Sequence, residues 1–164
     1  PVQTELPMWI GGSSDAAVRR TVKYGTGWQA GSETPEAVGQ VIAAIKDAAT
    51  RAGRSIDEDH YGAAFAYRFG DRDDPGVAKV MEHYKARTGR DADVHFAFGD
   101  AEAIIQRIAR YVENYACKFI LRPAADGDED MYLQTKRLVE EVLPLMAERW
   151  PRRAKNQRVN EPAE

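Results

Sequence analysis

Short apolar runs alternate with helical patterns along most of this chain, and this alternation limits the folds that it can adopt. Four runs are typical of strands, at residues 8–10, 27–30, 61–67 and 118–121. Between and after them, apolar residues recur at the three- and four-residue spacing of amphipathic helices. Strands that alternate with helices form a parallel sheet with the helices packed outside it. The sequence therefore predicts an α/β fold built from four βα units.

Several local signals fix where the helices begin and end. Thr34 is a predicted N-cap followed by proline and glutamate, and Asp100 is the predicted N-cap of a later helix. Pro144 removes a backbone donor, so we expect it to kink the last helix or to end its regular part. Between the third and fourth strands lies an excursion, in which residues 77–87 are predicted to be helical and residues 88–93 to be a polar loop.

The composition is that of an ordinary soluble domain. We place one domain at residues 1–150 and expect the polar tail at 151–164 to be disordered. The formal charge of −3 offers no basic surface for nucleic acid, and neither a membrane span nor a signal peptide is visible. Cys117 is the only cysteine and is expected to be buried and inert; the lack of a second one agrees with the cytoplasmic location that we expect.

The first strand leads directly into a turn of glycine and serine. Gly11, Gly12, Ser13 and Ser14 separate the apolar run from a helix that begins near Asp15. Glycine lets the backbone approach a phosphate, the first helical turn has unpaired N–H groups, and serine hydroxyls add donors. The same pattern also suits a serine-capped turn with no ligand, because it lacks the specificity of a full phosphate-loop motif. The pattern alone leaves both interpretations open.

Several segments resemble the bacterial luciferase-like oxidoreductases, and the resemblance covers about residues 1–148. The segments are LPMWIGGSSDAAVRR, YGTGWQAG, TPEAVGQVIAAIKDAATRAGR, FGDAEAIIQRIARYVENYACKFILRP and EEVLPLM. Their order resembles the C-terminal half of that family, which folds as a (β/α)8 barrel of the TIM type. The resemblance implies that this chain is a half-barrel of the fifth to eighth βα units. Thr26 stands where the family usually has an aspartate of structural role.

The resemblance also implies a function. It implies a flavin-linked oxidoreductase of the luciferase-like monooxygenase class that uses FMN or coenzyme F420 on a small-molecule substrate. The cofactor phosphate would lie at the loop after the fifth strand, which maps to Gly11–Ser14, so this chain would supply the cofactor-phosphate half. The first four units carry much of the ring and substrate pocket, so we expect the isolated chain to be inactive. The alternative is a non-catalytic half-barrel that works as a binding or assembly module.

Two further cofactor-binding candidates end strands at the face where active sites of this fold gather. Trp28 could wall the ring system or the phosphate loop, or be a core tryptophan. Arg122 could face a phosphate, an F420 tail or an acidic substrate, or pair with Asp126 or Asp128. Tyr67 and Arg68 are weaker candidates. We expect no metal site and no catalytic role for the three histidines, which lack a metal-ligand spacing: His60, His83 and His95.

A half-barrel leaves two strand edges unpaired, at residues 8–10 and 119–121, and an inner face without its opposite wall. Unpaired edges are templates for further pairing. We therefore expect a partner, either the missing N-terminal half-barrel or a second copy of the chain, or else a poorly folded chain. The residues expected on the inner face are Trp9 or Ile10, Phe65, and Ile120 or Leu121.

Overall fold

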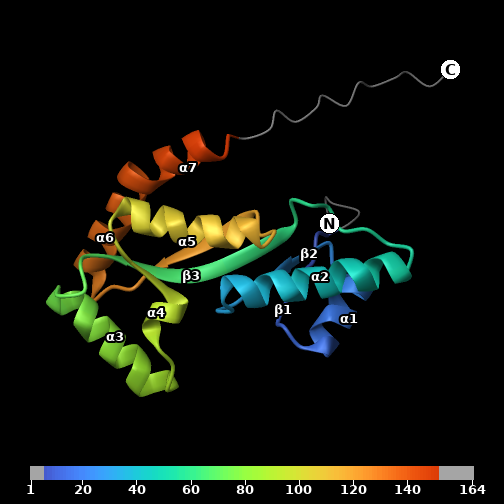
Figure 1. The fold of residues 1–164 in the computed structure, drawn as a ribbon, viewed down its shortest axis with the longest axis horizontal. Coiled ribbons are helices and arrows are strands. Elements are labelled where there is room, and N and C mark those ends of the chain that lie inside the picture. The colour runs from blue at the N-terminus through green and yellow to red at the C-terminus, as the bar shows by residue number, and fades with distance from the viewer. Residues whose placement is uncertain (1–5, 152–164) are drawn as a thin grey trace.

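The sheet has five strands, all parallel, in a computed structural model that describes residues 6–151. The strands are β1 (Trp9–Gly11), β2 (Gly27–Gln29), β3 (Tyr61–Phe69), β4 (Phe96–Gly99) and β5 (Lys118–Pro123). The helices are α1 (Asp15–Tyr24), α2 (Pro35–Arg51), α3 (Pro75–Thr88), α4 (Ala92–His95), α5 (Ala101–Glu113), α6 (Asp128–Arg137), the π-helical turn η1 (Leu138–Val142) and α7 (Leu143–Arg149). Figure 1 shows the arrangement of these elements.

The long strand β3 lies at the centre of the sheet. β5 pairs along one of its edges from Gly62 to Tyr67. The other edge is shared, because β2 pairs with the amino end of β3 and β4 with its carboxyl end. β1 adds to the outer side of β2. The four predicted βα units are thus confirmed, with β1, β2, β3 and β5 as their strands.

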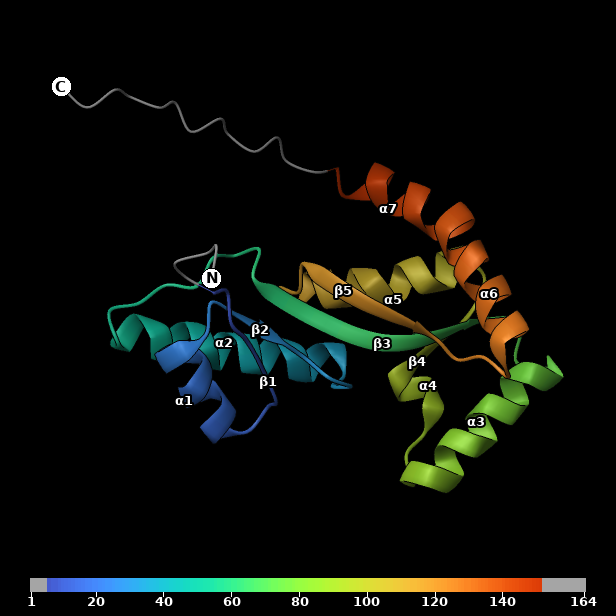
Figure 2. The ribbon, with the colours of Figure 1, turned by 180° about the vertical axis from the view of Figure 1, so that it is seen from behind.

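The predicted helix starts agree with the structure. The Thr34 and Asp100 side chains accept hydrogen bonds from the backbone N–H groups of the first turns of α2 and α5. The last helix is irregular as expected, because α6 gives way to η1 just before Pro144. There the N–H of Leu143 donates to the carbonyl of Leu138, five residues back. In Figure 2, α6 begins beyond the carboxyl end of β5, and the helical segment then turns back, so that α7 lies above α5 in the view.

The excursion between β3 and β5 contains an element that the sequence did not predict. The expected polar loop at residues 88–93 includes the start of α4, and it is followed at once by β4. β4 has only four residues, Phe-Ala-Phe-Gly, which is too short for alternation to separate it from a helix start. Its two phenylalanine rings, of Phe96 and Phe98, stack with centroids 5.5 Å apart.

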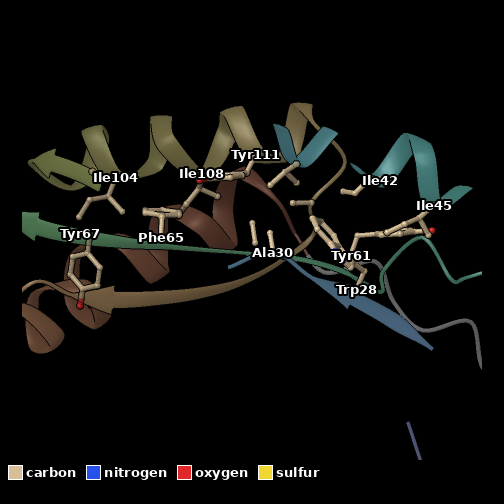
Figure 3. Packing of buried hydrophobic residues seen from close by; sticks show 14 of the residues in the cluster. Trp28, Ala30, Ile42, Ile45, Tyr61, Phe65, Tyr67, Ile104, Ile108 and Tyr111 are labelled. Atoms are coloured by element: carbon tan, nitrogen blue, oxygen red, sulfur yellow. The ribbon is translucent and has the colours of Figure 1, made fainter. Parts of the chain in front are cut away.

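Large apolar side chains fill the face of the sheet that α2 and α5 cover (Figure 3). Phe65 stacks on the ring of Tyr111 with centroids 5.4 Å apart and an interplanar angle of 7°. The expectation that Phe65 lies on the inner face is therefore wrong. Paired residues of parallel strands point to the same side, and Phe65 is paired with Leu121, which is packed against the helix-side core.

The opposite face of the sheet, which we call the open face, carries small residues on β3. Ala64 is paired with Ile120, whose side chain is 52% exposed. At the amino end, Trp9 lies across Gly27, where a Cβ atom would come within 2.7 Å of the indole. The Nζ of Lys118 lies 5.2 Å from the centre of the same indole ring. Trp9 and Ile120 thus occupy the inner face, as expected.

Both sheet edges are unpaired within residues 6–151, since β1 pairs only with β2 and β5 only with β3. Thr26 ties the start of β1 to the sheet: its N–H donates to the Met8 carbonyl at 2.8 Å, and its hydroxyl oxygen accepts the Met8 N–H at 2.8 Å. Thr26 therefore has a structural role at the start of the sheet. Cys117 is exposed, not buried as expected.

In the last helical segment, Met131 is 48% exposed and Leu145 is 37% exposed, whereas Val142 is fully buried. Across residues 6–151, none of the helices is both long and apolar enough to serve as a membrane span. The tail predicted to be disordered falls, from residue 152 on, outside the described residues.

Candidate functional site

The glycine–serine turn lies at the carboxyl end of β1, where the chain enters α1. All four of its residues, Gly11 to Ser14, are exposed. Gly12 has φ +95°, a conformation that favours glycine. The Ser14 side chain is the N-cap of α1 and accepts the N–H of Ala17 at 3.3 Å. The structure therefore confirms the strand–turn–helix order that the sequence predicted.

Trp28 supports this turn from below. Its side chain is fully buried on the helix side of the sheet, and its indole N–H donates to the Gly12 carbonyl at 2.8 Å. Figure 3 shows it close to Tyr61 and Ile42. Because the indole is fully buried, it cannot contact a ligand directly. It can affect a bound group only through its hydrogen bond to the turn. Trp28 holds the backbone of the turn in place.

The donors of the turn fit a phosphate group. The N–H groups of Asp15 and Ala16 belong to the first turn of α1, which has no backbone acceptors for them. The hydroxyl of Ser13 is exposed, and the hydroxyl proton of Ser14 remains available because its oxygen serves as the cap acceptor. One feature opposes an anion, since the carboxylate of Asp15 stands in the same turn. The turn can therefore hold a phosphate chiefly through backbone and hydroxyl donors.

Arg122 lies elsewhere, at the wall of a cavity of about 460 Å³. The cavity lies where β3 and β5 end, beneath α3. Within the described residues, Arg122 makes no hydrogen bond or ion pair, so the alternative that it pairs with Asp126 or Asp128 is wrong. Asp126 instead pairs with Lys79 at 2.5 Å. We call this space the α3 cavity; its lining includes Ser32, Ala66, Lys79, Val80, His83, Tyr84, Arg87, His95, Phe96 and Arg122.

The α3 cavity brings together side chains that the sequence did not connect. Lys79, His83 and Arg87 lie four residues apart on α3, so they share one face of that helix. His95 follows on α4, and its Nδ1 lies 2.9 Å from the Ser32 carbonyl. The signal that could have found them is this basic stripe at four-residue spacing inside the excursion.

Arg68 and Tyr67 have structural partners. Arg68 is 9% exposed and donates to the Ala124 carbonyl at 3.0 Å and to the Asp130 carboxylate at 2.5 Å. Burial acts to raise the pKa of Asp130, but the hydrogen bonds from Arg68 and from the Asp126 N–H outweigh it and hold that pKa below its usual value. The Tyr67 hydroxyl donates to the Gln134 carbonyl at 3.3 Å. Together they fasten α6 to the carboxyl end of β3.

At the other end of β3, the structure gathers the Asp57, Asp59 and His60 side chains, whose ligand atoms lie within 4.8 Å of one another. The two carboxylates are exposed. The ring of His60 also packs edge-on against Trp9, with centroids 5.5 Å apart. Exposed acidic groups often cluster without binding an ion, and we assign no metal to these residues.

Comparison with known proteins decides the family. A family model described as luciferase-like monooxygenase matches residues 1–114. The chain belongs to the luciferase-like monooxygenase family. The resemblance found in the sequence is therefore confirmed. No curated protein matches the chain by sequence.

Solved structures share the fold at low identity. An F420-dependent secondary alcohol dehydrogenase, in complex with an F420-acetone adduct, has a TM-score of 0.67 at 17% identity and covers 85% of this chain and 48% of its own. The coenzyme F420 dependent tetrahydromethanopterin reductase of Methanopyrus kandleri has a TM-score of 0.61 at 14% identity and covers 85% and 51%. The oxygenating constituent of 3,6-diketocamphane monooxygenase of Pseudomonas putida, in complex with FMN, has a TM-score of 0.59 at 13% identity and covers 85% and 48%.

The chain therefore spans about half the length of these luciferase-like structures. Its parallel α/β sheet is the fold class that the sequence predicted, a TIM-barrel type of which this chain covers a half-barrel. β4 is not one of the strands of the predicted units. It lies in the excursion between the strands β3 and β5 and adds to the sheet there.

Proposed function

We propose that this chain supplies the cofactor-phosphate half of a flavin-linked oxidoreductase that uses FMN or coenzyme F420. The observation that carries the proposal is the exposed turn Gly11–Ser14, set between the carboxyl end of β1 and the first turn of α1. Membership of the luciferase-like monooxygenase family supports a redox role. The relatives named above that bind F420 or FMN support this class of cofactor.

In this proposal, the residues of this chain bind and position the phosphate of the cofactor. When bound, the flavin or deazaflavin supplies two-electron redox chemistry. The backbone donors of Asp15 and Ala16 and the hydroxyls of Ser13 and Ser14 would hold its phosphate. Each hydrogen bond to a charged group contributes about 1.5–3 kcal/mol, so two or three can anchor a cofactor. Trp28 is the positioning residue, because it fixes the Gly12 carbonyl behind these donors.

We further infer that the open face is covered by four more βα units, which complete the barrel. The relatives are about twice as long as the region they share with this chain. Ile120 is half exposed on this face, and both strand edges are unpaired within residues 6–151. Several hundred Å² of apolar surface are worth several kcal/mol at about 25 cal/mol per Å². That is comparable to the net stability of a whole domain.

Adding a negative charge at the N-cap of α1 is the most direct test of whether the turn Gly11–Ser14 binds a phosphate. Ser14→Asp keeps a capping oxygen for α1 but adds a second carboxylate beside Asp15. We expect it to weaken FMN or F420 binding by tenfold or more, measured by fluorescence titration, whereas Ser14→Asn keeps the cap without a charge and costs much less. Ser13→Ala should weaken binding by about 1–3 kcal/mol, since one hydroxyl donor is lost.

The matched control is Ser55→Ala, in the exposed loop before β3 and away from the turn. Circular dichroism checks that α1 remains folded in each variant. If Ser14→Asp binds both cofactors as tightly as the unchanged chain does, then the phosphate does not bind at this turn and the proposal falls.

A further inference from the structure

The lining of the α3 cavity carries an excess of positive charge that acidic residues of the described part of the chain do not balance. Arg122, Arg87 and His83 have no hydrogen bond or ion pair with any residue between 6 and 151. Lys79 has one, with Asp126, and both side chains of that pair are about two-thirds exposed. Three permanent cations thus face one carboxylate across the cavity. A concave surface lined by one sign of charge concentrates ions of the opposite sign.

Two elements that are far apart in the sequence create this excess. Arg122 comes from the end of β5, while Arg87 and His83 come from one face of α3. His95 adds a ring to the lining, and its Nδ1 lies 2.9 Å from the Ser32 carbonyl. Since guanidinium groups match carboxylate and phosphate oxygens in geometry, the cavity is suited to an oxyanion group.

The other wall of the cavity is apolar and firmly packed. The rings of Tyr84 and Phe96 meet edge to face with centroids 4.7 Å apart. Phe96 is in turn stacked on Phe98 and is only 9% exposed. Ala66 and Val80 extend this wall. The volume of about 460 Å³ is in the range of small-molecule sites.

We propose that the α3 cavity binds a small organic anion, with a carboxylate or phosphate group held by Arg122 and Arg87 and an apolar body against Tyr84 and Phe96. The cavity lies at the carboxyl ends of β3 and β5 and shares no residue with the turn Gly11–Ser14. It is a second anion site beside that of the cofactor phosphate.

Binding of model anions to the 164-residue chain tests the proposal. Phenyl phosphate and benzoate are titrated by calorimetry, with benzyl alcohol as the uncharged probe and inorganic phosphate as the probe without an apolar body. We expect phenyl phosphate or benzoate to bind at least tenfold more tightly than benzyl alcohol and than inorganic phosphate. The ratio of phenyl phosphate to benzoate affinity identifies the preferred anionic group. Equal affinity for charged and uncharged probes would overturn the proposal.

Variants locate the binding. Arg122→Gln and Arg87→Gln should each weaken the tighter anion by about tenfold or more, since each removes a charge-assisted contact. Lys85→Gln is the matched control, because Lys85 lies on α3 but lines a different surface, with Met81 and Glu82. Both arginines are exposed, so neither substitution removes core packing. Loss of affinity in Lys85→Gln alone, or in none of the three, would contradict the assignment.

The two sites are separated by crossing the variants. Ser14→Asp should lose FMN or F420 but keep phenyl phosphate, and Arg122→Gln should do the reverse. If phenyl phosphate behaves as expected while no variant affects FMN or F420, the cofactor proposal falls and the α3 cavity stands. If Arg122→Gln, and not Ser14→Asp, loses FMN or F420, the cofactor phosphate binds in the α3 cavity and the claim of a second anion site is wrong.

Discussion

The two faces of the sheet are built from opposite kinds of side chain. Toward the helices, β3 presents large aromatic side chains that are almost fully buried: Tyr61, Phe65, Tyr67 and Phe69. Toward the open face the same strand presents Gly62, Ala64, Ala66 and Arg68. Burial on the helix side is deep enough to raise the pKa of Tyr61 and Tyr111 to about 12.

The difference between the faces indicates that the helix face stabilises the chain, whereas the open face is available for other contacts. The helix face has a second layer, because α2 and α5 pack on it. The open face is exposed around Ile120 within residues 6–151, whereas at its carboxyl end Arg68 is buried against α6. Small side chains on β3 leave room there, while Ile120 on the neighbouring strand leaves apolar surface to be covered.

The largest expected loss of stability comes from a substitution in the core of the helix face. Phe65→Ala removes a ring that is 1% exposed and stacked on Tyr111, and it should lower the free energy of unfolding by about 3–5 kcal/mol. Ile120→Ala, on the neighbouring strand, should cost less. Its cost should also vary with protein concentration if, as we propose, a partner covers Ile120. Urea unfolding at two protein concentrations measures both. A harmless Phe65→Ala would contradict the comparison.

The next effect concerns the carboxyl end of β3, where both faces are tied to α6. Asp130→Asn leaves the buried guanidinium of Arg68 without its carboxylate and should lower the free energy of unfolding by about 3 kcal/mol at neutral pH. The pKa of Asp130 is lowered in the folded chain, so the folded state binds fewer protons than the unfolded state does in acid.

The pH dependence has a definite sign. The stabilisation from Asp130 is complete above its ordinary pKa, about pH 4, and is lost as the pH falls through the lowered value. Urea unfolding between pH 3 and pH 7 should therefore show a smaller acid-dependent loss in Asp130→Asn than in the unchanged chain. Parallel pH profiles for the two proteins would show that this ion pair does not act as described.

The smallest expected loss of stability concerns Trp28, which links the helix-side core to the turn Gly11–Ser14. Trp28→Phe keeps an aromatic ring in the helix-side core but removes the hydrogen bond to the Gly12 carbonyl. We expect a loss of stability of about 1–2 kcal/mol from the lost hydrogen bond and the smaller ring, together with weaker cofactor binding at the turn. Hydrogen exchange of the Gly12 to Asp15 amides should quicken. If exchange there is unchanged, then Trp28 does not position the turn.

The order of the strands and helices could be predicted from the sequence because each βα unit has its own local signals. Caps such as Thr34 and Asp100 and the apolar spacing within helices depend on neighbours in the chain, and both were predicted correctly. The side of the sheet on which Phe65 lies depends on strand register, which local patterns did not fix, and that prediction was wrong. β4 was missed because its four residues are too few for alternation to distinguish a strand from a helix start.

The candidate sites show the same limit. The turn Gly11–Ser14 is contiguous, so its pattern could be found by inspection of the sequence. The α3 cavity is assembled from β5, α3 and α4, and only Arg122 among its cations had been singled out. His83 and His95 were set aside because they lacked a metal spacing, yet the fold brings both to the same cavity as Arg122. Sites formed across elements require the tertiary structure.

The central claim is that this chain is half of a barrel whose open face must be covered. Light scattering after size-exclusion chromatography of the chain alone, followed by a urea melt, tests it most directly. The account predicts a dimer or larger species, or a chain without a cooperative transition, because two strand edges and the face around Ile120 are otherwise left in water. A monodisperse monomer with a cooperative transition, independent of protein concentration, would contradict it and favour a binding module that folds by itself.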